Sequence, residues 1–132
     1  MTDMNRRSAL SLALAATAVA AAIKPASAQA PSHRGEGISE QDWGKRDTTI
    51  SGYKSVFMRD TIYQPGAKTG GGTMPHDMVC HVPEGELRVK QTDGMPFIAK
   101  KGDVWTCKKD SGEDVENVGS TVAIMRRILL IA

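Results

Sequence analysis

The sequence has few of the residues on which most catalytic and nucleic-acid-binding sites depend. It contains three histidines and two cysteines in 132 residues, and aromatic residues make up 5% of the chain. No histidine follows Ser111 in its polar loop, so no nucleophilic triad can be assembled around this serine. There is no run of basic residues either, and without one the chain lacks the electrostatic footprint of a nucleic-acid-binding protein. We therefore expect no nucleic-acid partner.

A hydrophobic run long enough to cross a membrane is also missing. The most apolar stretch, residues 9–23, is rich in alanine and about 15 residues long, whereas a membrane span needs about 20. It follows two arginines at 6–7 and precedes "ASA" at 26–28, the small-x-small pattern that signal peptidase reads. We predict that residues 1–28 are a signal peptide and that the mature protein is periplasmic or secreted, with no membrane anchor. The paired arginines fit the twin-arginine route but lack the phenylalanine usual after them, so Sec export stays open as well.

Cleavage of this segment would leave a chain of balanced charge. It removes three of the 17 basic residues and one of the 15 acidic residues, so 14 of each remain. A chain of about 100 residues is long enough for one domain with a single core. Cys80 and Cys107 would then lie in an oxidising compartment, where a disulfide between them has to be considered.

What the chain does contain is a series of short segments with strand character. Residues 29–52 are mostly polar without a clear period, and we predict that they form a flexible N-terminal arm or one swapped onto a partner. From residue 53 onward, stretches with β-branched and aromatic residues alternate with turns rich in Gly and Pro. This pattern predicts an all-β domain over residues 53–132, a small antiparallel β-barrel or jelly roll.

Residues in this part of the chain resemble the motifs of a small single-domain cupin. The second cupin motif reads G-x5-P-x-G-x2-H-x3-N, and Gly102 and Asn117 match its two ends at the right spacing. Lys108 and Asp110 replace its proline and internal glycine, and Glu113 replaces its histidine. The resemblance implies a cupin-type barrel over most of the mature chain, with Glu113 at a position where the family has a metal-binding histidine.

The first cupin motif, G-x5-H-x-H-x3,4-E-x6-G, is altered further. With Gly85 as its last glycine, its glutamate falls on Met78 and its histidines fall in the stretch "GGGT" at 70–73, on residues that cannot bind a metal. With its start at Pro65-Gly66 and "GGGT" as an insertion, His76-Asp77-Met78 replaces the H-x-H pair. In both alignments the family's set of three His and one Glu is missing. The resemblance therefore implies the cupin shape without its standard metal site.

The stretch "TMPHDMVCHV" at residues 73–82 concentrates sulfur and imidazole groups on one face. A β-strand sends alternate side chains to opposite faces. One face holds Met74, His76, Met78 and Cys80. Because Met78 falls on a family position that faces the barrel interior, this face is expected to point inward. His81 lies on the opposite face, where we expect a surface or dimer-interface residue.

These donors allow three interpretations. Thioether, thiol and imidazole groups suit copper better than Mn or Fe(II) bound through oxygen, and this favours a copper site in the barrel. Its predicted ligands are His76, Met78, Cys80 and Glu113. The same residues can instead be core fillers, because Met and Cys pack irregular gaps well and successive members of one strand face lie about 7 Å apart. A Cys80–Cys107 disulfide would compete with the metal site, since an oxidised cysteine cannot be a ligand.

Two functions follow from these interpretations. In the first, the protein is an exported cupin that binds a soft metal, with copper favoured, as an oxidoreductase-like enzyme or a metal-binding protein. In the second, it is a metal-free cupin that holds a small organic ligand in a cavity lined by Met78, Val82 and Trp105 or its neighbours, and Cys80–Cys107 is a structural disulfide. A homodimer is expected in both, because small cupins resemble one another in pairing through a sheet edge and an unpaired edge favours association.

Overall fold

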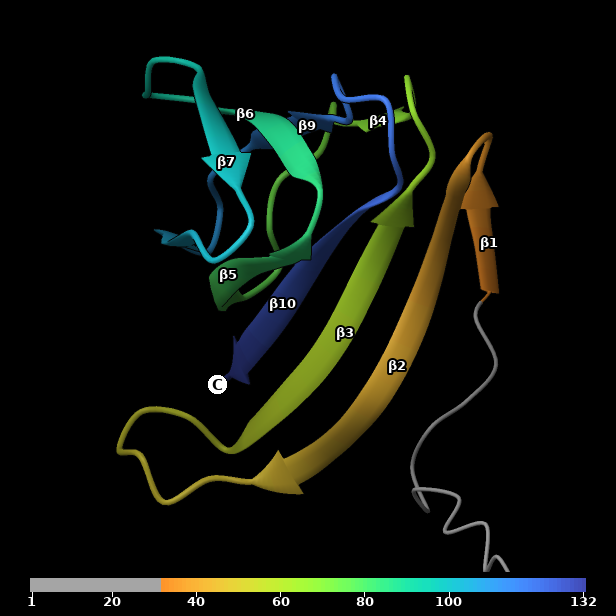
Figure 1. The fold of residues 1–132 in the computed structure, drawn as a ribbon. Coiled ribbons are helices and arrows are strands. Elements are labelled where there is room, and N and C mark those ends of the chain that lie inside the picture. The colour runs from red at the N-terminus through yellow and green to blue at the C-terminus, as the bar shows by residue number, and fades with distance from the viewer. Residues whose placement is uncertain (1–31) are drawn as a thin grey trace, which may run out of the picture.

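The protein folds into two antiparallel sheets that lie against each other (Figure 1). The computed structural model describes residues 32–132, so the predicted signal peptide at 1–28 lies outside the described residues. Every element in this part of the chain is a strand, and it contains no helix long and apolar enough to cross a membrane. The strands are β1 (Ser32–Gly35), β2 (Ile38–Asp47), β3 (Ser55–Tyr63), β4 (Lys68–Thr69), β5 (Asp77–Glu84), β6 (Glu86–Gln91), β7 (Phe97–Lys100), β8 (Val104–Cys107), β9 (Glu113–Glu116) and β10 (Ala123–Ile131). The prediction of an all-β domain of antiparallel strands is confirmed.

The larger sheet has six strands in the order β1-β2-β3-β10-β5-β8, and the smaller has four in the order β4-β9-β6-β7. All pairings are antiparallel, as the short connections and alternating patterns predict. The long strands β2, β3 and β10 lie side by side, and the smaller sheet covers one end of them (Figure 1).

The first residues of the domain differ from the sequence analysis. Residues 29–52 were expected to form an arm outside the barrel, but Ile38–Asp47 form β2, which pairs with β3 along its length. A bulge between Asp42 and Gly44 interrupts the register of this pair. The extra residue and the polar composition hide the period-two pattern, which is why the sequence of β2 does not read as a strand.

The core lies between the two sheets. In β5 the burial pattern alternates strictly, and Met78, Cys80 and Val82 are buried. The inward face predicted for the sulfur-rich stretch is therefore confirmed for its strand residues. The buried apolar residues that meet in this core are Ile38, Tyr63, Ala67, Met78, Cys80, Val82, Leu87, Val89, Ala99, Cys107, Val115, Ala123 and Met125.

Two positions of the cupin motifs fix the connections between the sheets. Gly85 has a φ of 76°, and a Cβ there would meet the Cα of Ala123 at 2.7 Å, so only glycine fits where the chain passes from β5 to β6. Asn117 is buried, and its Nδ2 donates to the carbonyl oxygens of Tyr63 at 3.0 Å and Thr121 at 2.9 Å. The motif asparagine thus ties the end of β3 to the loop before β10.

Candidate ligand cavity

A cavity of about 490 Å³ lies at the inner side of the six-stranded sheet, beside the loop that joins β4 to β5. Its walls combine apolar side chains with a small number of charged ones. Its lining comprises Glu40, Arg59, Tyr63, Thr69, Gly70, Gly72, Thr73, Met74, Pro75, Met78, Glu113, Val115, Met125, Arg127 and Leu129. Small-molecule sites commonly combine apolar and aromatic side chains with converging polar groups, and this cavity contains both kinds of residue.

The lining includes the positions of all four ligands in the cupin motifs. If the shorter spacing of the first motif is counted back from Met78, its two histidine positions fall on Gly72 and Met74. Gly72, Met74, Met78 and Glu113 all line the cavity. The residues that occupy these positions do not fit the family's metal, because glycine has no donor and thioethers are poor ligands for hard ions. Within residues 32–132, no three His, Cys, Asp or Glu side chains are close enough to hold a metal ion.

The structure brings together two of the four predicted ligands. Met78 and Glu113 both line the cavity, whereas His76 and Cys80 do not. His76 precedes the first residue of β5, so the alternation that turns Met78 inward does not extend to it. Cys80 lies deeper in the core with no exposed surface. Met74, which the sequence analysis placed on the inward face although not among the ligands, also lines the cavity.

Glu113, at the start of β9, is 4% exposed. Its Oε2 accepts a hydrogen bond from Trp105 Nε1 at 3.0 Å and another from Gln91 Nε2 at 3.3 Å. Both donors are neutral, and within the described part of the chain no Lys, Arg or His forms an ion pair with this carboxylate. Its position therefore combines burial with a charge that has no counter-charge beside it.

The two cysteines are free thiols packed in the core. Cys107 is the cross-strand partner of Met78, and Cys80 is the partner of Trp105, so the two cysteines occupy diagonal positions. Diagonal neighbours in an antiparallel pair have Cα atoms about 7–8 Å apart, beyond the roughly 4.4–6.8 Å that a disulfide spans. The strand register thus explains why these thiols are not joined. Burial raises the pKa of both, and the nearby Glu113 carboxylate raises the pKa of Cys80 further.

Three methionines line the cavity, but the register separates two of them. Met78 pairs with Leu129 on β10, and Met125 lies four residues before Leu129. At the usual rise of a strand this places the two methionines about 13 Å apart along the sheet. The thioethers of Met78 and Met125 therefore cannot easily converge on one ion, whereas both can line the surface of one organic molecule.

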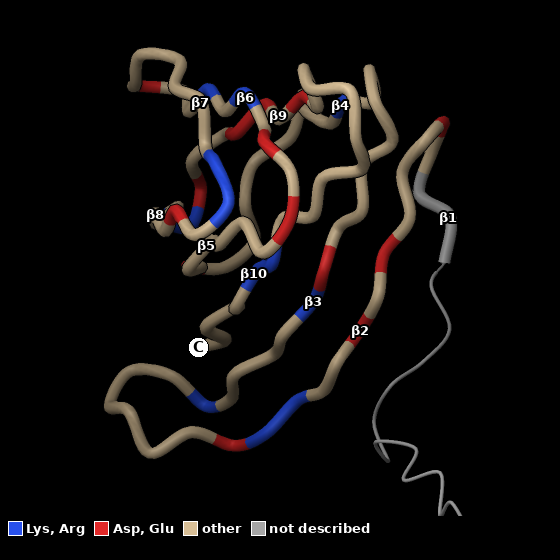
Figure 2. The backbone as a smooth tube through the Cα atoms, in the orientation of Figure 1, with Lys and Arg blue, Asp and Glu red and all other residues tan. Residues whose placement is uncertain are grey.

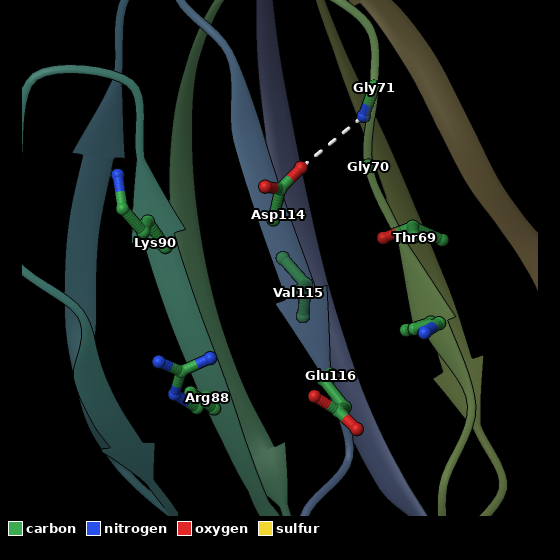
Figure 3. Close-up of a pocket in the computed structure, with 9 residues that line it drawn as sticks. Thr69, Gly70, Gly71, Arg88, Lys90, Asp114, Val115 and Glu116 are labelled. Carbon is green, nitrogen blue, oxygen red and sulfur yellow. Dashed lines mark hydrogen bonds between the residues drawn. The ribbon is translucent and has the colours of Figure 1, made fainter.

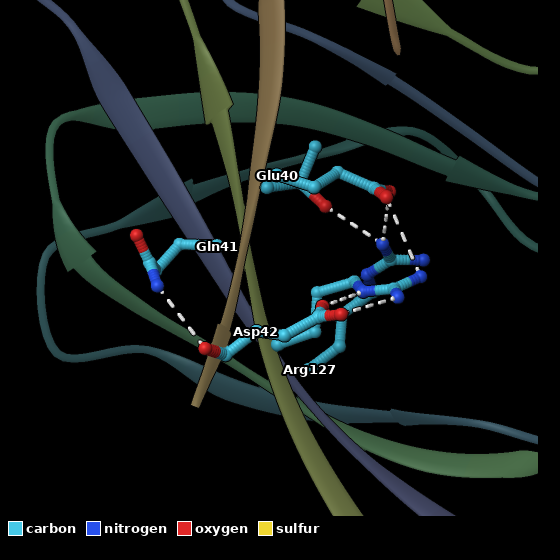
Figure 4. A network of polar contacts seen from close by, with 6 residues as sticks. Glu40, Gln41, Asp42 and Arg127 are labelled. Carbon is cyan, nitrogen blue, oxygen red and sulfur yellow. Dashed lines mark hydrogen bonds and ion pairs between the residues drawn. The ribbon is translucent and has the colours of Figure 1, made fainter. Parts of the chain in front are cut away.

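A network of charged side chains forms one wall of the cavity (Figure 4). Arg127 Nη2 donates to Glu40 Oε1 at 2.9 Å and to Thr61 Oγ1 at 2.8 Å. Arg59 lies 3.4 Å from Glu40 Oε2 and holds Asp42 through two hydrogen bonds. The bonds from Arg59 lower the pKa of Asp42. Two acids therefore face two bases, and the charges within this network cancel.

These charges come from three neighbouring strands (Figure 2). Glu40 and Asp42 lie on β2, Arg59 lies on β3 and Arg127 lies on β10. No sequence signal indicated the network, because its members are isolated charges in separate strands and β2 itself was expected to be an arm. Only the register of β2 on β3 places Asp42 opposite Arg59.

A second hollow, of about 540 Å³, lies on the outer face of the four-stranded sheet (Figure 3). Its charged residues face each other across the strands: Glu116 pairs with both Lys68 and Arg88, and Asp114 pairs with Lys90. Asp114 also accepts a hydrogen bond from the Gly71 backbone at 3.3 Å. Alternating charges on an exposed sheet face are what a solvated surface requires, so we assign no ligand to this groove.

No model of a known protein family matches this chain, and no curated protein matches its sequence. Its structure does match solved cupin domains. An RmlC-like cupin from Shewanella frigidimarina matches with a TM-score of 0.60 and 18% identity, over 78% of this chain and 84% of that one. KdgF from Halomonas sp. matches with a TM-score of 0.61 and 13% identity, over 79% and 88%.

A third match is the Cupin_2 domain of an XRE family transcriptional regulator from Enterobacter cloacae. Its TM-score is 0.61 and its identity 16%, over 74% of this chain and 99% of that domain. At such identities the likeness shows the fold. The prediction of a cupin-type fold is therefore confirmed.

Proposed function

We propose that this cupin binds a small organic molecule in the cavity between its sheets. The observation that carries the proposal is the lining itself: a space of about 490 Å³ whose walls hold Tyr63 and three methionine thioethers beside a few charged groups. The volume falls within the range of about 300–1,000 Å³ that is usual for small-molecule pockets. The family's ligand positions are occupied by side chains that shape such a cavity better than they hold a hard metal.

Methionine methyl groups give a direct test. Protein labelled with ¹³C at the methionine methyls would be titrated with a panel of small neutral, anionic and cationic organic molecules. We expect at least one compound to shift the signals of Met74, Met78 and Met125, which line the cavity. Met58 on β3 and Met95, which is 85% exposed, do not line it and serve as internal references.

A pair of glycine variants separates cavity binding from surface binding. Gly72 lines the cavity and a Cβ there would meet no atom within 4 Å, so Gly72→Phe adds a large side chain at the cavity wall without a backbone clash. Gly94→Phe, in a turn outside the cavity, is the matched control. Gly72→Phe should abolish the methyl shifts and Gly94→Phe should keep them. If no compound shifts the cavity methyls, or if shifts persist in Gly72→Phe, the proposal is wrong.

Copper binding is the second candidate function, favoured by the presence of Met74, Met78 and Glu113 in one cavity. Two thioethers and a carboxylate would suit copper(I) better than manganese. Metal analysis of protein from the native host, with Met78→Leu beside Met58→Leu, tests it. One copper per chain, lost in Met78→Leu and retained in Met58→Leu, would support it. A copper-free parent, or equal retention by both variants, would exclude this site.

We also propose that residues 1–28 are a signal peptide and that the mature protein is exported. The pattern that supports this lies outside the described residues. Intact-mass measurement of protein from the native host tests it. A mature chain that begins at Gln29 is expected, and retention of residues 1–28 would contradict it.

We also propose that the domain pairs with a second copy through a sheet edge. The edge strands β7 and β8 and the preceding turn carry exposed large apolar residues, which are Met95, Phe97, Ile98 and Val104. Sedimentation of the parent beside Val104→Lys tests this, with Ile50→Lys in the β2–β3 loop as the control. A dimer weakened only by Val104→Lys is expected, and a monomeric parent would contradict the proposal.

A further inference from the structure

We infer that the ligand of the cavity carries a protonated amine, and that Glu113 binds this ammonium group. The inference rests on the proposed function and names the chemical class of the ligand. It follows from the distribution of charge around the cavity together with the methionine side chains in its wall.

The charged network does not call for an ionic ligand. Glu40 and Asp42 are neutralised by Arg59 and Arg127 through the ion pairs described above. A carboxylate ligand could reach one donor that has no partner among the described residues, Nε of Arg127, but it would then bring a second negative charge next to Glu40, which Arg127 already binds. The network therefore disfavours an anion and adds no net charge to the wall.

Glu113 is the one acid on the cavity wall that has no counter-charge among the described residues. Its Oε2 accepts hydrogen bonds from Trp105 and Gln91, and its Oε1 has no hydrogen-bond partner among residues 32–132. A buried carboxylate is stabilised by a cation that donates hydrogen bonds to it, and an alkylammonium group supplies up to three such donors. The charge that completes this cavity is therefore positive.

The rest of the wall favours an organic cation over a hydrated inorganic one. Met74, Met78 and Met125 offer apolar, polarizable surface to an alkyl chain. A strongly hydrated metal ion would lose its water shell to these groups without gaining oxygen ligands. The lining and the single carboxylate together fit a primary amine with a short hydrocarbon body.

The test uses n-hexylammonium, n-hexanol and n-hexanoate as probes of nearly equal size. Each is titrated into chelator-treated protein labelled at the methionine methyls, so that metal plays no part. We expect hexylammonium to bind roughly 10- to 100-fold more tightly than hexanol, which is the size of a charge-assisted hydrogen bond. Hexanoate should bind most weakly.

Two charge-removing variants on one strand locate the effect. Glu113→Gln should abolish the preference for hexylammonium over hexanol, whereas Glu116→Gln, on the outer face of β9, should keep it. Glu113→Asp retains the charge and should preserve part of the preference if Glu113→Gln fails to fold.

Tighter binding of hexanol or hexanoate than of hexylammonium would overturn the inference and leave the proposed function standing. A preference that survives in Glu113→Gln would also overturn it. If none of the three probes moves the cavity methyls while another compound of the broad panel does, the inference fails alone. If the whole panel fails, the proposed function fails with it.

Discussion

The two ends of the inner face of the six-stranded sheet are built in different ways. Where the smaller sheet covers β3 and β10, the inward residues are apolar, and Tyr63, Ala123 and Met125 are almost fully buried. Farther along the same strands, the inward residues are Arg59 and Arg127, which pair with acids of β2. One pair of strands thus passes from a hydrophobic core to a charged network.

The difference shows what each end requires. The covered end is stabilised by the removal of apolar surface from water, which depends on volume and tolerates many sequences. The charged end depends on the direction of individual hydrogen bonds, and one buried donor, Nε of Arg127, has no partner among the described residues. A partly satisfied network contributes little to stability. Its larger effect is on the shape of the cavity it borders and on where charged groups lie in the wall.

The largest effect is expected at the covered end. Leu87 has no exposed surface, and Leu87→Ala should lower the free energy of unfolding by about 3 kcal/mol because it leaves a cavity in the core. Ile98→Ala, at a position that is 43% exposed, should cost less than about 1 kcal/mol. Urea unfolding of both variants measures this. Similar losses in the two would mean that the core is not where the structure places it.

At the charged end, a double variant should be more stable than the single variant from which it is made. Arg127→Met should cost about 2–3 kcal/mol, because Glu40 stays buried without its closer partner. Adding Glu40→Leu should recover most of the loss, since no unpaired charge remains. A double variant that is less stable than Arg127→Met would show that the network itself supplies stability.

High pH should lower the free energy of unfolding through the two buried thiols of the covered end. The raised pKa values of Cys80 and Cys107 mean that the native state keeps both thiols protonated where the unfolded chain loses their protons. Stability should be full below the unfolded thiol pKa of about 8.5 and should fall as the pH rises above it. Urea unfolding at a series of pH values, beside the Cys80→Ala/Cys107→Ala variant, checks this. An equal decline in the variant would assign the effect to other groups.

The smallest effect should come from the turn at Asp110, between β8 and β9. Asp110 has a φ of 68° and stands where the cupin motif has glycine. Asp110→Gly should raise the free energy of unfolding by about 0.5–1 kcal/mol, because glycine adopts this conformation without steric cost. Thermal unfolding measures it, and Lys109→Gly at the adjacent position is the control. A loss of stability in Asp110→Gly would mean that the aspartate side chain has a role in the turn.

The sequence by itself determined the all-β class, the cupin fold and the inward face of β5. Each depends on local information: alternation along a strand, Gly and Pro between strands, and motif residues at fixed spacings such as Gly102 and Asn117. The position of Glu113 inside the domain also followed from its motif spacing. These features are readable because each is encoded within a short stretch of chain.

Only the tertiary structure decided the composition of the cavity. His76 was expected inside and lies outside the lining because the strand begins after it, whereas Met125 lines the cavity without having been predicted. The place of β2, and with it the pairing of Asp42 with Arg59, depends on a register set by a bulge. Which side chains meet across strands that are far apart in the chain is decided by register and packing, and no single segment carries that information.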